Sequence, residues 1–118
     1  MKITVNTQSH PGSAVLSLKG TLTADYTQDL ENAVANALKT ARALVLDFEE
    51  LNLLDSTGLG ALIRCLRMSL AARSSIYLAN VKSGPRMVLQ LTRTHRLFDI
   101  YDSVDAAIAG LELEGQIA

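Results

Sequence analysis

Short apolar runs alternate with amphipathic helical stretches along this chain. The runs 43–48 and 75–79 are rich in Leu, Val and Ile and are too short for helices, which favours buried strands. Between them, apolar residues at 59, 62, 63, 66 and 70 recur at helical spacing, and we expect a helix from Ser56 to Arg73. Alternation of this kind predicts a sheet with parallel neighbouring strands and helices packed over it.

The remaining segments extend this pattern in both directions. A Pro-Gly turn at 9–12 separates two strand-like stretches and predicts an antiparallel pair near the N-terminus. We expect a first helix from about Asp25 to Thr40, a third helix with Pro85 in its first turn, a short strand at 98–101, and a last helix capped by Ser103. The prediction is a single α/β domain over residues 1–118, with a mixed four- to five-stranded sheet and about four helices.

Composition argues against several classes of function. The chain has 11 Lys and Arg and 12 Asp and Glu. The resulting net charge of −1 argues against sequence-independent nucleic-acid binding. The lone Cys65 excludes an intramolecular disulfide and a CxxC metal or redox motif. No apolar run approaches the roughly 20 residues that span a bilayer, and the N-terminus lacks the apolar core of a signal peptide. We therefore expect a cytoplasmic domain with no membrane insertion, no direct nucleic-acid contact, no metal and no cofactor.

The segment 55–60, Asp-Ser-Thr-Gly-Leu-Gly, lies between a predicted strand and a predicted helix and has three interpretations. In the first it only starts the helix, because Asp, Ser and Thr oxygens accept hydrogen bonds from free backbone N–H groups. In the second, Gly58 and Gly60 begin a phosphate-binding loop, although Ile63 stands where the third glycine of that fingerprint belongs. In the third, Ser56 is itself phosphorylated, since a helix N-terminus favours an added dianion. Spacing alone does not choose between the first and the third.

A family resemblance favours the third interpretation. The segment 55–60 looks like the signature of anti-sigma factor antagonists, the bacterial members of the STAS domain family. The resemblance covers nearly the whole chain and includes Leu-Lys-Gly at 18–20, Leu-Val-Leu-Asp at 44–47 and Arg-Leu-Phe-Asp-Ile at 96–100. It implies a STAS-type fold in which Ser56 is the phosphoacceptor, with Thr57 as the less favoured neighbouring hydroxyl. The partner-binding residues that it implies are Asp55, Ser56, Thr57, Gly58 and Leu59.

The resemblance also implies a function, partner switching. The unphosphorylated domain would bind an anti-sigma factor that is a serine kinase and so free a sigma factor. The kinase would phosphorylate Ser56 with ATP, and a PP2C-type phosphatase would remove the phosphate. The alternative is a STAS scaffold or accessory subunit of a stress-signalling or lipid-transport assembly, with Ser56 only starting a helix. Weak self-association is left open by the sequence.

Two positions depart from the family pattern. Many relatives carry an acid soon after the glycine that ends the second strand, whereas here Gly20 is followed by Thr21, Leu22 and Thr23, and the first acid is Asp25. Relatives often have Gly-Leu after the third helix, where this chain has Arg-Thr at 93–94. Because glycine there would serve as a left-handed helix cap, we expect the turn to be rebuilt.

Other chemistry-bearing residues favour no enzyme. His10 and His95 are far apart in sequence and lie in predicted loops, and no GxSxG motif accompanies them. We interpret Cys65 as a packed, inert thiol. We interpret the arginines at 64, 67 and 73 as a solvated helix face rather than a rim for an acidic partner.

Overall fold

The computed structural model describes residues 1–7 and 12–113 and shows an α/β fold of five strands and four α-helices in that part of the chain. The strands are β1 (Lys2–Asn6), β2 (Ser13–Leu22), β3 (Ala43–Leu54), β4 (Ser75–Ala79) and β5 (Asp99–Tyr101). The helices are α1 (Thr27–Ala37), α2 (Ser56–Ala71), α3 (Ser83–Leu91) and α4 (Val104–Leu113), with short 3₁₀ turns η1 (Ala24–Tyr26) and η2 (Thr94–Arg96). The predicted fold class and order of elements are confirmed.

The strands form one mixed sheet in sequence order, β1-β2-β3-β4-β5. β1 runs antiparallel to β2, and every later neighbour is parallel, as the alternation of strands and helices predicts. Of the predicted turn at 9–12, only Gly12 belongs to the described residues; it has a φ of +84°. No helix in the described ranges is both long and apolar enough to cross a bilayer.

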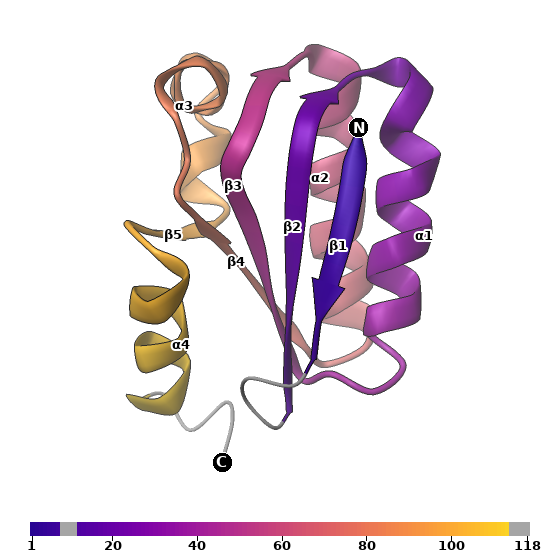
Figure 1. The fold of residues 1–118 in the computed structure, drawn as a ribbon, viewed down its shortest axis with the longest axis vertical. Coiled ribbons are helices and arrows are strands. Elements are labelled where there is room, and N and C mark those ends of the chain that lie inside the picture. The colour runs from indigo at the N-terminus through magenta and orange to yellow at the C-terminus, as the bar shows by residue number, and fades with distance from the viewer. Residues whose placement is uncertain (8–11, 114–118) are drawn as a thin grey trace.

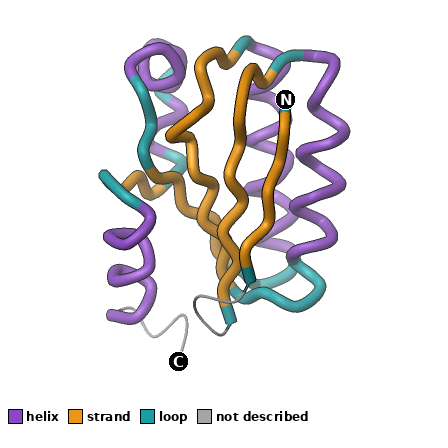
Figure 2. The backbone as a smooth tube through the Cα atoms, viewed as in Figure 1, coloured by secondary structure: helices purple, strands orange, loops and turns teal. Residues whose placement is uncertain are grey.

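The sheet is covered on both faces, by different helices (Figures 1 and 2). Leu44 and Leu46 of β3 belong to the large apolar cluster that also contains buried residues of α1 and α2. Ala43 and Val45, which alternate with them, pack with Ala107 and other residues of α4. Burial on both faces explains why this strand is a continuous apolar run rather than an alternating one.

The expected end of the third strand was wrong. The sequence predicts a strand at 43–48, but β3 continues to Leu54 and buries Leu51. It stays paired with β2 through two register shifts, between Ser17 and Lys19 and between Gly20 and Thr21. Each irregularity interrupts the two-residue alternation on which recognition of a strand depends.

The first two helices are shorter than expected. α1 ends at Ala37 rather than Thr40, and 3₁₀ turn η1 precedes it where helix was predicted from Asp25. α2 ends at Ala71, two residues before Arg73, which takes a left-handed φ of +56°. The buried side of α1 includes Leu30 and Val34 as expected, and Leu59 and Leu62 of α2 are buried, but Leu70, which was expected on the same face of α2, is 65% exposed.

The expectation of a rebuilt turn after the third helix was also wrong. Arg93 adopts the left-handed conformation that a glycine would take there, with a φ of +61°. The Thr92 hydroxyl donates to the carbonyl oxygen of Val88 at 2.6 Å, and the Thr94 hydroxyl donates to that of Leu89 at 3.3 Å. These hydroxyls satisfy carbonyl groups at the end of α3, so the cap survives without glycine.

Candidate functional site

The segment 55–60 begins α2 at the edge of the sheet where β2 and β3 end (Figure 1). Asp55 is the N-cap residue, in extended conformation with φ −102° and ψ −178°. Its N–H donates to the carbonyl oxygen of Leu22 at the end of β2, at 3.3 Å. Its own carbonyl oxygen accepts the first helical hydrogen bond, from the N–H of Leu59 at 2.9 Å. Two strands therefore fix the position at which the helix starts.

The Asp55 carboxylate is held by two donors of the same segment. Its Oδ1 accepts from the N–H of Gly58 at 2.8 Å and from the Thr57 hydroxyl at 2.7 Å. The Gly58 hydrogen bond, followed by that of Thr57, lowers the pKa of Asp55 below its ordinary value of 3.8. At neutral pH the start of α2 therefore carries a fixed negative charge next to Ser56.

Gly58 is required by a close approach of two chain segments. It is buried, and a Cβ atom at this position would clash with the carbonyl oxygen of Leu22. The neighbouring Leu59 side chain is also buried, at 7% exposure, in the large apolar cluster. Gly58 and Leu59, two of the predicted partner-binding residues, are therefore packed against the rest of the domain. The exposed side chains of the segment are those of Ser56 and Thr57.

The two hydroxyls differ in their hydrogen bonding. Thr57 gives its proton to Asp55, whereas the Ser56 hydroxyl makes no hydrogen bond to any residue of the described ranges. Ser56 is exposed and is the first helical residue of α2. An exposed serine at a helix N-terminus is accessible to an enzyme and lies where backbone dipoles stabilise an added anion.

Exposed ion pairs lie near this edge and join residues of β3 to Lys19 of β2 and to Lys82, the residue before α3. Lys19 Nζ is 3.5 Å from Glu50 Oε2, and Lys82 Nζ is 3.9 Å from Glu49 Oε1. All four side chains are more than half exposed, so these pairs contribute little to stability and leave the carboxylates within reach of solvent.

The remaining candidate residues do not form a second reactive centre in the described part of the chain. His10 lies outside the described residues, and His95 is half-buried, with Nδ1 3.3 Å from the carbonyl oxygen of Leu89. Cys65 is buried, and burial raises the pKa of its thiol to about 12, which fits an inert packed side chain. No group of three His, Cys, Asp or Glu side chains within the described ranges could hold a metal ion.

Sequence reasoning missed the partner of Arg64. Its Nε and Nη2 donate to the two carboxylate oxygens of Glu31 on α1, at 2.9 and 3.1 Å. This bidentate pair joins the two helices that cover one face of the sheet. The partners are 33 residues apart, so no local spacing could have indicated the pair.

The family model of the STAS domain matches residues 4–107. Among solved structures, the chain is similar to the anti-sigma factor antagonist SpoIIAA in its unphosphorylated form, with a TM-score of 0.77, 19% identity and 97% of each chain covered. An anti-sigma factor antagonist from Mycobacterium paratuberculosis gives a TM-score of 0.80 at 23% identity, covering 94% of this chain and 95% of that one. A sulfate transporter family protein from Wolinella succinogenes gives 0.79 at 17% identity, with 90% of each chain covered. At these identities the likeness is one of fold.

Proposed function

This chain belongs to the STAS domain family, and from that premise we propose that it is an anti-sigma factor antagonist that acts by partner switching. In its unphosphorylated form it binds an anti-sigma factor that is a serine kinase, and a sigma factor is released. Phosphorylation of Ser56 separates the two proteins, and a PP2C-type phosphatase restores the binding form. The domain of residues 1–118 works in the cytoplasm as the substrate of these enzymes and has no catalytic activity of its own.

The observation that carries this proposal is the difference between the two adjacent hydroxyls. Thr57 donates to the Asp55 carboxylate at 2.7 Å, so its oxygen is held within the helix cap. Ser56 is exposed and hydrogen-bonded to none of the described residues, so its oxygen can enter a kinase active site without disrupting the cap. This difference supports Ser56, rather than Thr57, as the phosphoacceptor.

A phosphate at this position would change binding more than folding. The N-terminus of α2 favours an anion, so the fold tolerates the added group. Phosphorylation adds about −1.5 to −2 of charge beside the Asp55 carboxylate, and the formal charge of −1 becomes roughly −3. An interface built around a neutral hydroxyl would have to desolvate this charge, and each ~1.4 kcal/mol of penalty weakens binding tenfold.

Asp25 is the first acidic residue after Gly20, where the sequence departs from the family pattern. Thr23 precedes η1, and the exposed Asp25 lies within η1, directly after the strand end that holds Asp55 and Gly58. We propose that the exposed Asp25 supplies an acidic contact to the kinase.

The experiment is phosphorylation by the cognate anti-sigma kinase with ATP, followed by intact mass and peptide mapping. Wild type and Thr57→Val should each gain one phosphate on Ser56, and Ser56→Ala should gain none. Phosphate on Thr57, or full modification of Ser56→Ala, would contradict the assignment of Ser56.

The second candidate is a STAS scaffold or accessory subunit without a switch. It is favoured by the similarity to the sulfate transporter family protein. The TM-score of that protein, 0.79, is between the values of 0.77 and 0.80 for the two antagonists. In that case Ser56 would only begin α2, and partner binding would be the same for wild type and Ser56→Asp. Tight binding to a protein that leaves every hydroxyl unmodified would favour this candidate.

A further inference from the structure

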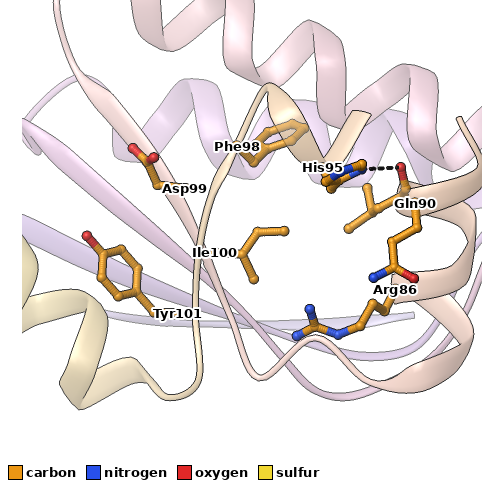
Figure 3. Close-up of a pocket in the computed structure, with 8 residues that line it drawn as sticks. Arg86, Gln90, His95, Phe98, Asp99, Ile100 and Tyr101 are labelled. Atoms are coloured by element: carbon orange, nitrogen blue, oxygen red, sulfur yellow. Dashed lines mark hydrogen bonds between the residues drawn. The ribbon is translucent and has the colours of Figure 1, made fainter. Parts of the chain in front are cut away.

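A surface cavity of about 460 Å³ lies between α3, η2 and β5 (Figure 3). This volume is within the range of sites for small organic ligands. Its walls come from segments 86–90 and 95–101, and none of its lining residues belongs to the segment 55–60. The cavity is therefore a feature separate from Ser56, and the inference drawn from it is independent of the proposed switch.

Arg86 provides the cavity with a cation that forms no ion pair with the described residues. Its Nε donates to the carbonyl oxygen of Val81 at 3.4 Å, and none of the described carboxylates pairs with the guanidinium. Arg64, by contrast, donates to both carboxylate oxygens of Glu31. In Figure 3 the Arg86 side chain extends from α3 toward the side of the cavity that carries Ile100 and Tyr101. The Nη donors of a half-buried guanidinium suit an anionic acceptor.

His95 places a second polar group on the cavity wall. Its Nδ1 lies 3.3 Å from the carbonyl oxygen of Leu89, and because a carbonyl only accepts, Nδ1 carries the hydrogen. The other ring nitrogen, Nε2, is then left for a ligand. The ring is half-buried, so its position is held by the surrounding structure.

The other lining residues narrow the class of ligand. Leu89 and Phe98 are buried and Ile100 is half-buried, so one side of the cavity is apolar. Asp99 adds an exposed carboxylate to the lining. Its negative charge repels a dianion such as phosphate about twice as strongly as a monoanion, so a ligand with a single negative charge that pairs with Arg86 is favoured.

We propose that this cavity binds a small organic monocarboxylate with a short apolar body. The carboxylate pairs with the guanidinium of Arg86, and the apolar body packs against Leu89, Phe98 and Ile100. An apolar wall with a few polar groups that fix orientation is the usual composition of a small-molecule site.

The probe that tests the proposal is 4-methylpentanoate, with the neutral 4-methylpentanamide as its matched control. Each is titrated at millimolar concentration into the ¹⁵N-labelled chain and followed by amide chemical shifts. The expected result is saturable shifts in α3, η2 and β5 with the carboxylate, and binding of the amide that is at least about tenfold weaker. Shifts that map elsewhere, equal affinities for both probes, or no saturable binding would overturn the proposal.

Variants separate the role of Arg86 from a general effect of charge. Arg86→Gln should weaken 4-methylpentanoate binding at least about tenfold, whereas Arg67→Gln, on the exposed side of α2, should leave it unchanged. Gln90→Trp is a second test that keeps Arg86. Residue 90 is exposed on α3 and lines the cavity, so a tryptophan there should fill the cavity and abolish binding. This variant tests the site even if Arg86→Gln lowers the stability of the protein. Unchanged affinity in Arg86→Gln or in Gln90→Trp would contradict the proposed site.

Discussion

The start of α2 and the end of α3 are both helix termini beside a candidate site, and they are built in opposite ways. At the start of α2, each local requirement is met by the residue type suited to it, with Asp55 as the cap and Gly58 where no Cβ fits. At the end of α3, Arg93 takes a left-handed conformation and the hydroxyls of Thr92 and Thr94 satisfy helix carbonyls. The first terminus can be recognised from its sequence, and the second depends on contacts that only the folded chain shows.

The largest effect on stability is expected from Gly58→Ala. The new Cβ would clash with the backbone carbonyl of Leu22, so β2 or α2 must move, at a cost of about 3 kcal/mol in the free energy of unfolding. Urea unfolding monitored by circular dichroism measures the change.

Gly60→Ala is the matched control for this prediction. A Cβ atom there would meet only the Nη1 atom of Arg64, at 3.4 Å, and alanine is the better helix former, so stability should rise by up to ~1 kcal/mol. Equal losses in the two variants would show that the close approach to Leu22 does not determine the need for glycine.

A pH-dependent effect is expected from Asp55. Its folded pKa lies below the ordinary value of 3.8, so its contribution to stability is complete above that pH and is lost as the pH falls through the folded value. Asp55→Asn keeps an N-cap acceptor but removes the titration. The wild type should therefore be more stable than Asp55→Asn, and the difference in the free energy of unfolding should be largest at neutral pH. This difference should disappear as the pH falls below 3.8. A gap that is constant over this range in urea unfolding would contradict the ionised cap.

The smallest effect is expected at the end of α3, from Arg93→Gly. Glycine adopts the observed φ of +61° without the steric penalty of a Cβ atom, and stability should rise by about 0.5–1 kcal/mol. The control is Arg67→Gly within α2, which should lower stability by about 1 kcal/mol because the helix interior disfavours glycine. A loss of stability in both variants, measured by thermal unfolding, would show that the threonine hydroxyls make Arg93 the better residue.

The sequence was sufficient for the elements whose signals are local. Unbroken apolar character identified the strand beginning at Ala43, helical spacing identified α2, and the predicted cap at Ser103 is confirmed by its hydroxyl oxygen, which accepts from the N–H of Ala106 at 3.0 Å. The continuation of β3 to Leu54 was missed because register shifts against β2 interrupt the alternation of side chains.

Features that join distant segments could not be predicted from the sequence. The pair between Arg64 and Glu31 links residues on two helices, and the cavity beside Arg86 forms only when β5 packs next to α3. The hydrogen bonding within residues 55–57 could not be predicted either, although it is local, because Asp55, Ser56 and Thr57 are all residue types that favour a helix start. The family resemblance favoured Ser56, and the observed hydrogen bond from Thr57 to Asp55 adds a physical difference between the two hydroxyls.

The central claim is that negative charge at Ser56 switches partner binding, and calorimetry with the anti-sigma kinase tests it most directly. Ser56→Asp and Ser56→Asn are close in size and differ in charge. The account predicts that Ser56→Asn binds with nearly the affinity of unmodified wild type and that Ser56→Asp binds at least about a hundredfold more weakly. Equal affinities for the two variants would contradict the switch.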